Sequence, residues 1–111
     1  MSLSLRFIFV KWEHSPGRIL GYERLSLSHQ DYELFDRIRA EATPIDGVLL
    51  SYEDEGIKDR SDDPYGTQLT FLTAHRLAKH FEGVEMEAWD AAVLAFVKAL
   101  PPSTRIVLWW S

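Results

Sequence analysis

Two segments near the ends of this 111-residue chain are apolar on both of the faces that a β-strand would present. Successive side chains of a strand point to opposite sides of its sheet. Residues 3–12 place two apolar sets on opposite sides, namely Leu5, Phe7 and Phe9, and Ile8, Val10 and Trp12. Residues 104–110 do the same with Val107 and Trp109, and with Ile106, Leu108 and Trp110. Strands of this kind are covered on both faces, so these segments predict a sheet with something packed on each side.

The next elements are expected between these two strands. A helix is predicted over residues 28–42, with Ser28 as its N-cap and Asp31 in its first turn, where a carboxylate favours the helix dipole. Residues 48–53 and 67–73 have the composition of strands. Residues 18–27 fit either a short strand or a packed irregular segment, and both alternatives stay open.

A second helical region follows the last of these strands. Thr73 is a suitable N-cap for it, and Gly83 is expected to close or kink it, as a residue without Cβ does after a helix. Residues 89–100 then form the clearest amphipathic helix of the chain, and Pro101 ends it. Its predicted core-facing residues share helical spacing: Trp89, Ala92, Val93, Phe96, Val97 and Leu100.

The order of these elements is β-α-β-β-α-β. It predicts an α+β, ferredoxin-like two-layer sandwich with an antiparallel sheet, an insertion after the first strand and a broken second helix. A chain of 111 residues suits a single globular domain, so residues 1–111 are taken as one. The right-handed crossover rule places the first and third strands at the centre of the sheet.

A two-layer fold leaves the second face of this sheet uncovered. Its helices can cover only one of the two apolar sets of the terminal strands. The other set requires the insertion at residues 13–27, a second copy of the chain, or a bound ligand to cover it.

Charge and cysteine content exclude several classes of function. The chain holds 17 acidic and 12 basic residues, and a net charge of −5 argues against nucleic acid as the main partner. Cysteine is absent, which excludes disulfides, thiolate metal sites and Cys nucleophiles. The N-terminus lacks a signal-peptide pattern, and no apolar run approaches the ~18 residues that cross a bilayer. A cytoplasmic protein without membrane contact is therefore expected.

The acidic residues are concentrated in two segments. Residues 53–66 hold six acidic and two basic side chains, and residues 82–90 hold four acidic and no basic ones. Each segment carries −4, so the other 88 residues carry a net +3. The protein is thus a slightly basic domain with two acidic patches.

Residues 53–66 invite comparison with a calcium-binding loop. An EF-hand loop that began at Ser61 would have Asp63 at its third position, but Tyr65 at its fifth and Leu72 at its twelfth. Tyr65 replaces an oxygen ligand and the bidentate Glu is missing. The interpretation adopted is a solvated hairpin loop, and neither a metal nor another cofactor is predicted.

The histidines show no catalytic or metal-binding pattern. His75 and His80 are five residues apart and do not share a helix face as zinc ligands at i and i+4 would. The sequence Ser28-His29-x-Asp31 resembles a triad only in composition, because triads are assembled from separate segments. No glycine-rich phosphate loop occurs, and no catalytic residue is predicted.

The leading hypothesis is therefore a small acidic protein–protein interaction or regulatory module without catalytic machinery. Its partner would be a protein, with a basic one favoured by the acidic loop, or a second copy bound through the sheet face. The predicted interaction surface comprises Glu53, Asp54, Glu55, Asp59, Asp62, Asp63, Trp109 and Trp110. The alternative is a small-molecule-binding protein or enzyme with an apolar pocket at a dimeric sheet interface, lined by Trp12, His14, Tyr22 and His29.

Overall fold

The structure, a computed structural model, describes residues 4–14, 18–28, 31–45, 47–52 and 56–111. Within these, residues 10–14, 18–24, 49–52 and 56–58 are described by their backbone alone. The described strands are β1 (Leu5–His14), β2 (Arg18–Ser26), β3 (Thr43–Pro44), β4 (Val48–Tyr52), β5 (Gly56–Arg60), β6 (Thr70–Thr73) and β7 (Arg105–Trp110). The helices are α1 (Tyr32–Glu41), α2 (Ala74–His80) and α3 (Ala88–Ala99). The fold class is α+β, as the sequence predicts.

The strands form one sheet in the order β3-β6-β7-β1-β2-β4-β5. All neighbouring pairs are antiparallel except β2 and β4, which are parallel. This order differs from the ferredoxin-like one, in which the first and third strands of the predicted set would be neighbours. Here β1 lies between β2 and β7, and β6 lies beyond β7.

Two features of the chain explain this difference. Residues 18–26 form a full strand that pairs with β1 as a hairpin, so the helical crossover through α1 starts from β2 and not from β1. The break in the second helical region produces two helices in place of one. The chain leaves β6 through α2 and returns through α3, and Ala74 N–H donates to Thr104 O at 2.8 Å, close to where β7 begins. The return makes β6 and β7 antiparallel neighbours.

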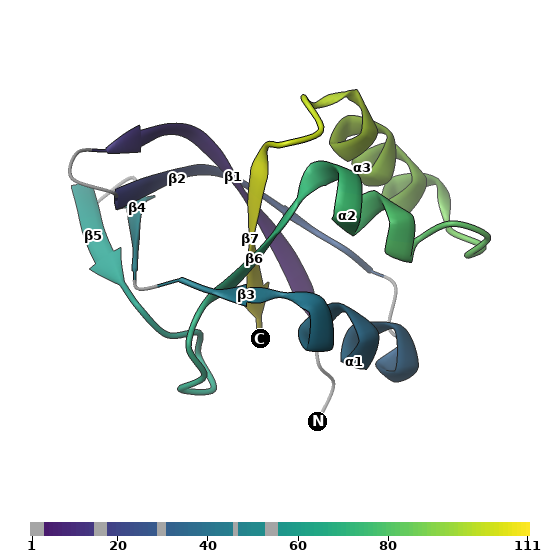
Figure 1. Ribbon diagram of the computed structural model, residues 1–111, viewed down its shortest axis with the longest axis horizontal. Coiled ribbons are helices and arrows are strands. Elements are labelled where there is room, and N and C mark those ends of the chain that lie inside the picture. Colours follow the sequence, from purple (N-terminus) through teal and green to yellow (C-terminus); the bar gives the residue numbers. More distant parts are fainter. Residues whose placement is uncertain (1–3, 15–17, 29–30, 46, 53–55) are drawn as a thin grey trace.

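All three described helices pack on one face of the sheet (Figure 1). The main core lies between them and that face. It contains the apolar set of β1 that the alternation predicts, Leu5, Phe7 and Phe9, and the matching set of β7, Ile106, Leu108 and Trp110. From α1 it receives Leu34, Phe35 and Ile38. The predicted alternation is confirmed for residues 5–9 of β1 and for β7, while the side chains of Val10 and Trp12 lie outside the described part.

The described part of the opposite face of the sheet is covered by segments of the chain itself. Ile8 and Val107 have no exposed surface, and they pack with Val48 and Leu69 in a second, smaller core. Ile45 N–H donates to Leu69 O, and Leu69 N–H donates to Ser61 O, both at 2.9 Å. These bonds join the segments flanking β4 and β5 to the segment that leads into β6, so the sheet bends around the second core (Figure 1).

Local signals place most element boundaries near the expected ones, with two corrections. The N-cap of α1 is Asp31 and not Ser28, because the Asp31 carboxylate accepts the Leu34 N–H at 3.2 Å. The acidic segment is not a single loop, since it contains β5. Thr73 caps α2 as predicted, and Gly83 follows that helix with φ +76, a conformation that glycine adopts without steric cost. None of the helices described here is long and apolar enough to cross a membrane.

Candidate functional site

Helix α3 carries apolar side chains on both of its sides. Its sheet-facing side is buried and consists of Asp90, Val93, Leu94 and Val97. The opposite side is exposed, and we call it the outward face of α3; it consists of Ala88, Trp89, Ala92, Ala95, Phe96 and Ala99. At about 100° per residue, these six side chains lie on one arc of roughly 120°. A surface helix normally presents polar residues on this side, and a helix that is apolar all round is normally buried.

The two aromatic residues make this face a continuous apolar surface. The side chains of Trp89 and Phe96 are 56% and 46% exposed. They lie seven residues apart, which is two helical turns, and thus on the same flank of the outward face. Aromatic residues are enriched in protein interfaces, and Trp is among the residues most enriched at the contacts that dominate binding energy.

Contacts with the rest of the fold fix α3 in position. The Asp90 carboxylate is 1% exposed and accepts two hydrogen bonds from Ser28, from its N–H at 2.8 Å and its hydroxyl at 3.0 Å. The Trp89 indole N–H donates to Ser26 O at 2.7 Å. The ring of Phe96 packs edge-on against Phe9, with ring centroids 4.9 Å apart. The outward face therefore belongs to a helix held at both ends.

A depression of about 230 Å³ adjoins one flank of α3. It is lined by Phe81, Val84, Met86, Ala91, Leu94 and Lys98. Two other depressions lie nearby on the helical layer, one of about 120 Å³ beside Pro102 and one of about 220 Å³ beside Thr43. All three are smaller than the 300–1,000 Å³ of ordinary small-molecule sites.

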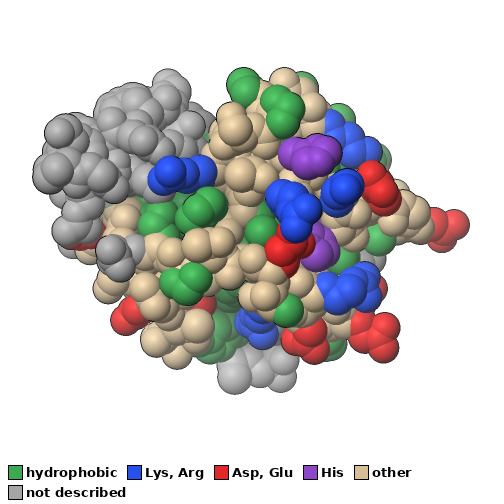
Figure 2. Space-filling view, in the orientation of Figure 1, with side chains coloured by type: hydrophobic (Ala, Val, Ile, Leu, Met, Phe, Trp, Pro, Cys, Tyr) green, Lys and Arg blue, Asp and Glu red, His purple; other side chains and the backbone are tan. Residues whose placement is uncertain are grey.

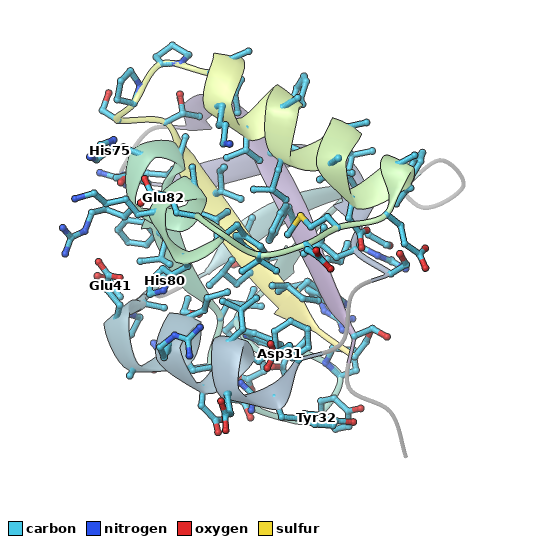
Figure 3. All side chains as sticks on the ribbon, turned by 90° about the vertical axis from the view of Figure 1, so that its right-hand side faces the viewer. Asp31, Tyr32, Glu41, His75, His80 and Glu82 are labelled. Atoms are coloured by element: carbon cyan, nitrogen blue, oxygen red, sulfur yellow. The ribbon has the colours of Figure 1, made fainter. Side chains whose placement is uncertain are left out.

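A polar cluster joins the C-terminal end of α1 to α2. The two carboxylate oxygens of Glu41 contact the Arg76 Nε, at 2.5 Å, and the His80 Nε2 (Figure 3). Desolvation of the Glu41 carboxyl raises its pKa, but the hydrogen bonds and charges of His80 and Arg76 outweigh this and hold the pKa below its ordinary value of 4.5. Glu41 is thus a charged tie between two helices.

Basic and histidine side chains surround this cluster. Figure 2 shows them gathered over α2, where His75, Arg76 and Lys79 are exposed. In the part of the chain that the structure describes, no group of three or more His, Asp or Glu is arranged to hold a metal ion. The cluster has the contacts of a structural ion pair, because the Glu41 carboxylate contacts both His80 and Arg76.

The acidic residues predicted as an interaction surface have different positions. Glu53, Asp54 and Glu55 lie outside the described residues. Asp59 and Asp62 are exposed, and the prediction that they meet a partner remains a prediction. Asp63 is 5% exposed, and its Oδ1 accepts the N–H groups of Tyr65 and Thr67 at 2.9 and 3.1 Å. Asp63 therefore shapes the turn before β6.

The two C-terminal tryptophans lie on opposite sides of the sheet. Trp110 is 4% exposed and packs in the main core, 5.1 Å from Phe35, with Arg39 over its ring. Trp109 is half-buried against the second core, and the Arg60 guanidinium lies 5.3 Å from its ring centre. The prediction of Trp110 as a surface contact is corrected, because the helices cover it.

The predicted pocket receives no support from the residues that can be placed. The side chains of Trp12, His14 and Tyr22 lie outside the described part, as does His29. The sheet-face residues that decide the question are Ile8, Val10, Leu108 and Trp110. Ile8, Leu108 and Trp110 are buried within this one chain, and the side chain of Val10 lies outside the described part. A second copy is therefore not needed to cover the three buried residues.

The outward face of α3 was missed by the sequence interpretation. The amphipathic pattern predicts Trp89, Ala92 and Phe96 as core residues, whereas the structure exposes all three. The pattern correctly identifies Val93 and Val97 as core. The available signal was the alanine series at positions 88, 92, 95 and 99, which forms a second apolar side of the same helix.

Comparison with protein-family models, with curated proteins and with solved structures found no match to this chain.

Proposed function

We propose that this protein is a small protein-interaction module, cytoplasmic in location, that docks a helix of its partner on the outward face of α3. The observation that carries the proposal is the exposure of Trp89 and Phe96 on a helix whose outer side is otherwise alanine. The function class agrees with the hypothesis drawn from composition. The surface differs, because it lies on α3 and not on the acidic loop or the terminal tryptophans.

The energetics of this face favour a packed partner over solvent. Burial of apolar surface stabilises by about 25 cal/mol per Å², and the two aromatic side chains offer the largest areas. The alanines allow a second helix to approach toward the short end of the 8–10 Å range of interaxial distances. Since α3 is already fixed by Asp90 and Trp89, little further ordering would accompany docking.

A helix is the partner element that suits this shape. The face is a straight ridge about 18 Å long, the length of a 12-residue helix. Recognition of this kind uses side chains at intervals of three and four residues, which is the spacing of the alanines. A small molecule would find no enclosed volume on such a ridge.

Site-specific photo-crosslinking tests the proposal. A photoreactive side chain replaces Ala92 on the outward face or, as the matched control, Ala40, an exposed alanine of α1. In a lysate of the source cells, position 92 should give discrete protein adducts, with itself or with another protein, that position 40 does not give. Equal adduct patterns at the two positions would contradict the proposal.

A further inference from the structure

We infer that the partner helix is α3 of a second copy, packed antiparallel across a two-fold axis. The inference rests on the proposed function and names its partner. It follows from the way the two flanks of the outward face complement each other when the helix is turned about the point between Ala92 and Val93.

The centre of the face has the spacing of a helix–helix seam. Ala88, Ala92, Ala95 and Ala99 are separated by four, three and four residues. This is the a/d spacing by which two helices interlock along their length. A ridge of alanine, with no larger side chain along it, permits close contact with an equally small ridge, which a second copy supplies.

The two flanks of the ridge carry matching pairs. Glu87 and Lys98 lie on one flank, and Trp89 and Phe96 lie on the other. Both pairs are centred on the same point of the helix, between Ala92 and Val93. In an antiparallel pair with its two-fold axis at that point, Glu87 meets Lys98 of the second copy, and Trp89 meets its Phe96. Each contact occurs twice.

The side chains that would form these contacts are available. Glu87 is the N-cap residue of α3, is exposed, and makes no capping hydrogen bond with its side chain. Lys98 is exposed in the last turn. In a parallel two-fold pair, the flank with Glu87 and Lys98 would instead face the flank with Trp89 and Phe96, so the charges would meet aromatic rings and not each other. The charges therefore select the antiparallel orientation.

The size of the face sets the strength of the dimer. A stable interface buries about 800 Å² on each partner, and a 12-residue helix supplies the central part of such an area. We therefore expect a dissociation constant in the range of about 1–100 µM. Exposed ion pairs contribute little each, but reversing a charge replaces attraction with repulsion at two places at once.

Sedimentation equilibrium of the purified full chain tests the inference. The wild type should be a reversible dimer. Glu87→Lys and Lys98→Glu should each weaken dimerisation by about tenfold or more, and the double variant should recover to within about threefold of wild type. Glu33→Lys is the control, because it reverses an exposed acid in the first turn of α1. It should leave the dissociation constant within about threefold.

Three results would overturn the inference. Charge reversals without effect, or without recovery in the double variant, would exclude the antiparallel pair. In the second case, the wild type stays monomeric at about 0.5 mM, while the photoreactive side chain at position 92 crosslinks to another protein. This result would exclude a second copy as the partner and would leave the proposed function standing. A monomer whose position 92 gives no specific adduct would overturn both.

Discussion

Asp90 is the clearest case in which one residue decides the position of a helix, here α3, on which we place the proposed interaction surface. A carboxylate that is 1% exposed in an apolar core is costly unless hydrogen bonds compensate it. Ser28 supplies two such bonds, from its backbone and its hydroxyl. Ser28, which the sequence suggested as a helix cap, thus connects the segment after β2 to α3, which begins 60 residues later in the chain.

We expect Asp90→Ala to reduce the free energy of unfolding by about 2–3 kcal/mol, since it removes both hydrogen bonds that Ser28 donates to the buried carboxylate. Urea denaturation measures this loss. Ser28→Ala removes the hydroxyl bond alone and should cost about 1 kcal/mol. A double variant that costs the full sum of the two single losses would show that the residues do not interact, contrary to this account.

The Glu41 cluster predicts a pH dependence. The folded-state pKa of Glu41 lies below its ordinary value of 4.5, so its ion pairs stabilise the fold above pH 4.5 and are lost as the pH falls through the folded-state value. Glu41→Gln should cost about 1 kcal/mol at pH 7. Near pH 3 the cost should be smaller, because the unfolded-state carboxyl, with its ordinary pKa of 4.5, is then largely protonated and the ion pairs favour the folded state less.

Urea denaturation at the two pH values checks this prediction. Glu33→Gln, on the exposed side of the same helix, serves as the control and should change stability by less than about 0.5 kcal/mol. If Glu41→Gln lowered the free energy of unfolding equally at pH 7 and pH 3, the charge of Glu41 would not contribute to the contact between α1 and α2.

At the scale of the elements, helix α3 shows how far periodicity predicts burial. The 3.6-residue spacing identifies the helix and its two buried valines. It cannot assign Trp89 and Phe96, because the helix has two apolar sides and the sequence does not say which one meets the sheet. The side is decided by tertiary contacts, among them the bond from Trp89 to Ser26 and the burial of Asp90.

Adjacent substitutions in α3 should separate these two sides. Leu94→Ala is expected to cost 2–5 kcal/mol, because it opens a cavity in the main core. Ala95→Glu is expected to change the free energy of unfolding of the monomer by less than about 0.5 kcal/mol, yet to abolish self-association. Urea denaturation at low concentration and sedimentation at high concentration measure the two effects. An Ala95→Glu variant that still dimerises would place the contact elsewhere.

At the scale of the whole molecule, the two apolar faces of β1 and β7 predict the two cores. The identity of what covers the second face does not follow from the sequence. Ile45, Leu69 and Val48 come from segments that appear as loop or short strand, and only the bend of the sheet brings them over Ile8 and Val107. Strand order was also beyond reach, because it depends on residues 18–26 pairing with β1 as a hairpin.

The same two-core arrangement explains why we place the proposed interaction surface on the helical side. Segments of the chain cover the described part of the sheet face opposite the helices. The terminal tryptophans pack on the two sides of the sheet, Trp110 in the main core and Trp109 against the second core. The large apolar area that remains exposed on the described elements includes the outer side of α3. Evidence for a partner therefore shifts from the sheet to this helix.

Disulfide trapping tests the central claim most directly, because the chain contains no cysteine of its own. A single Ala92→Cys substitution lies beside the proposed two-fold axis, where two copies would meet within the reach of a disulfide. The account predicts rapid conversion to a covalent dimer under mild oxidation at micromolar concentration, while the control Ala40→Cys on α1 remains largely monomeric. Equal, slow oxidation of the two variants would contradict it.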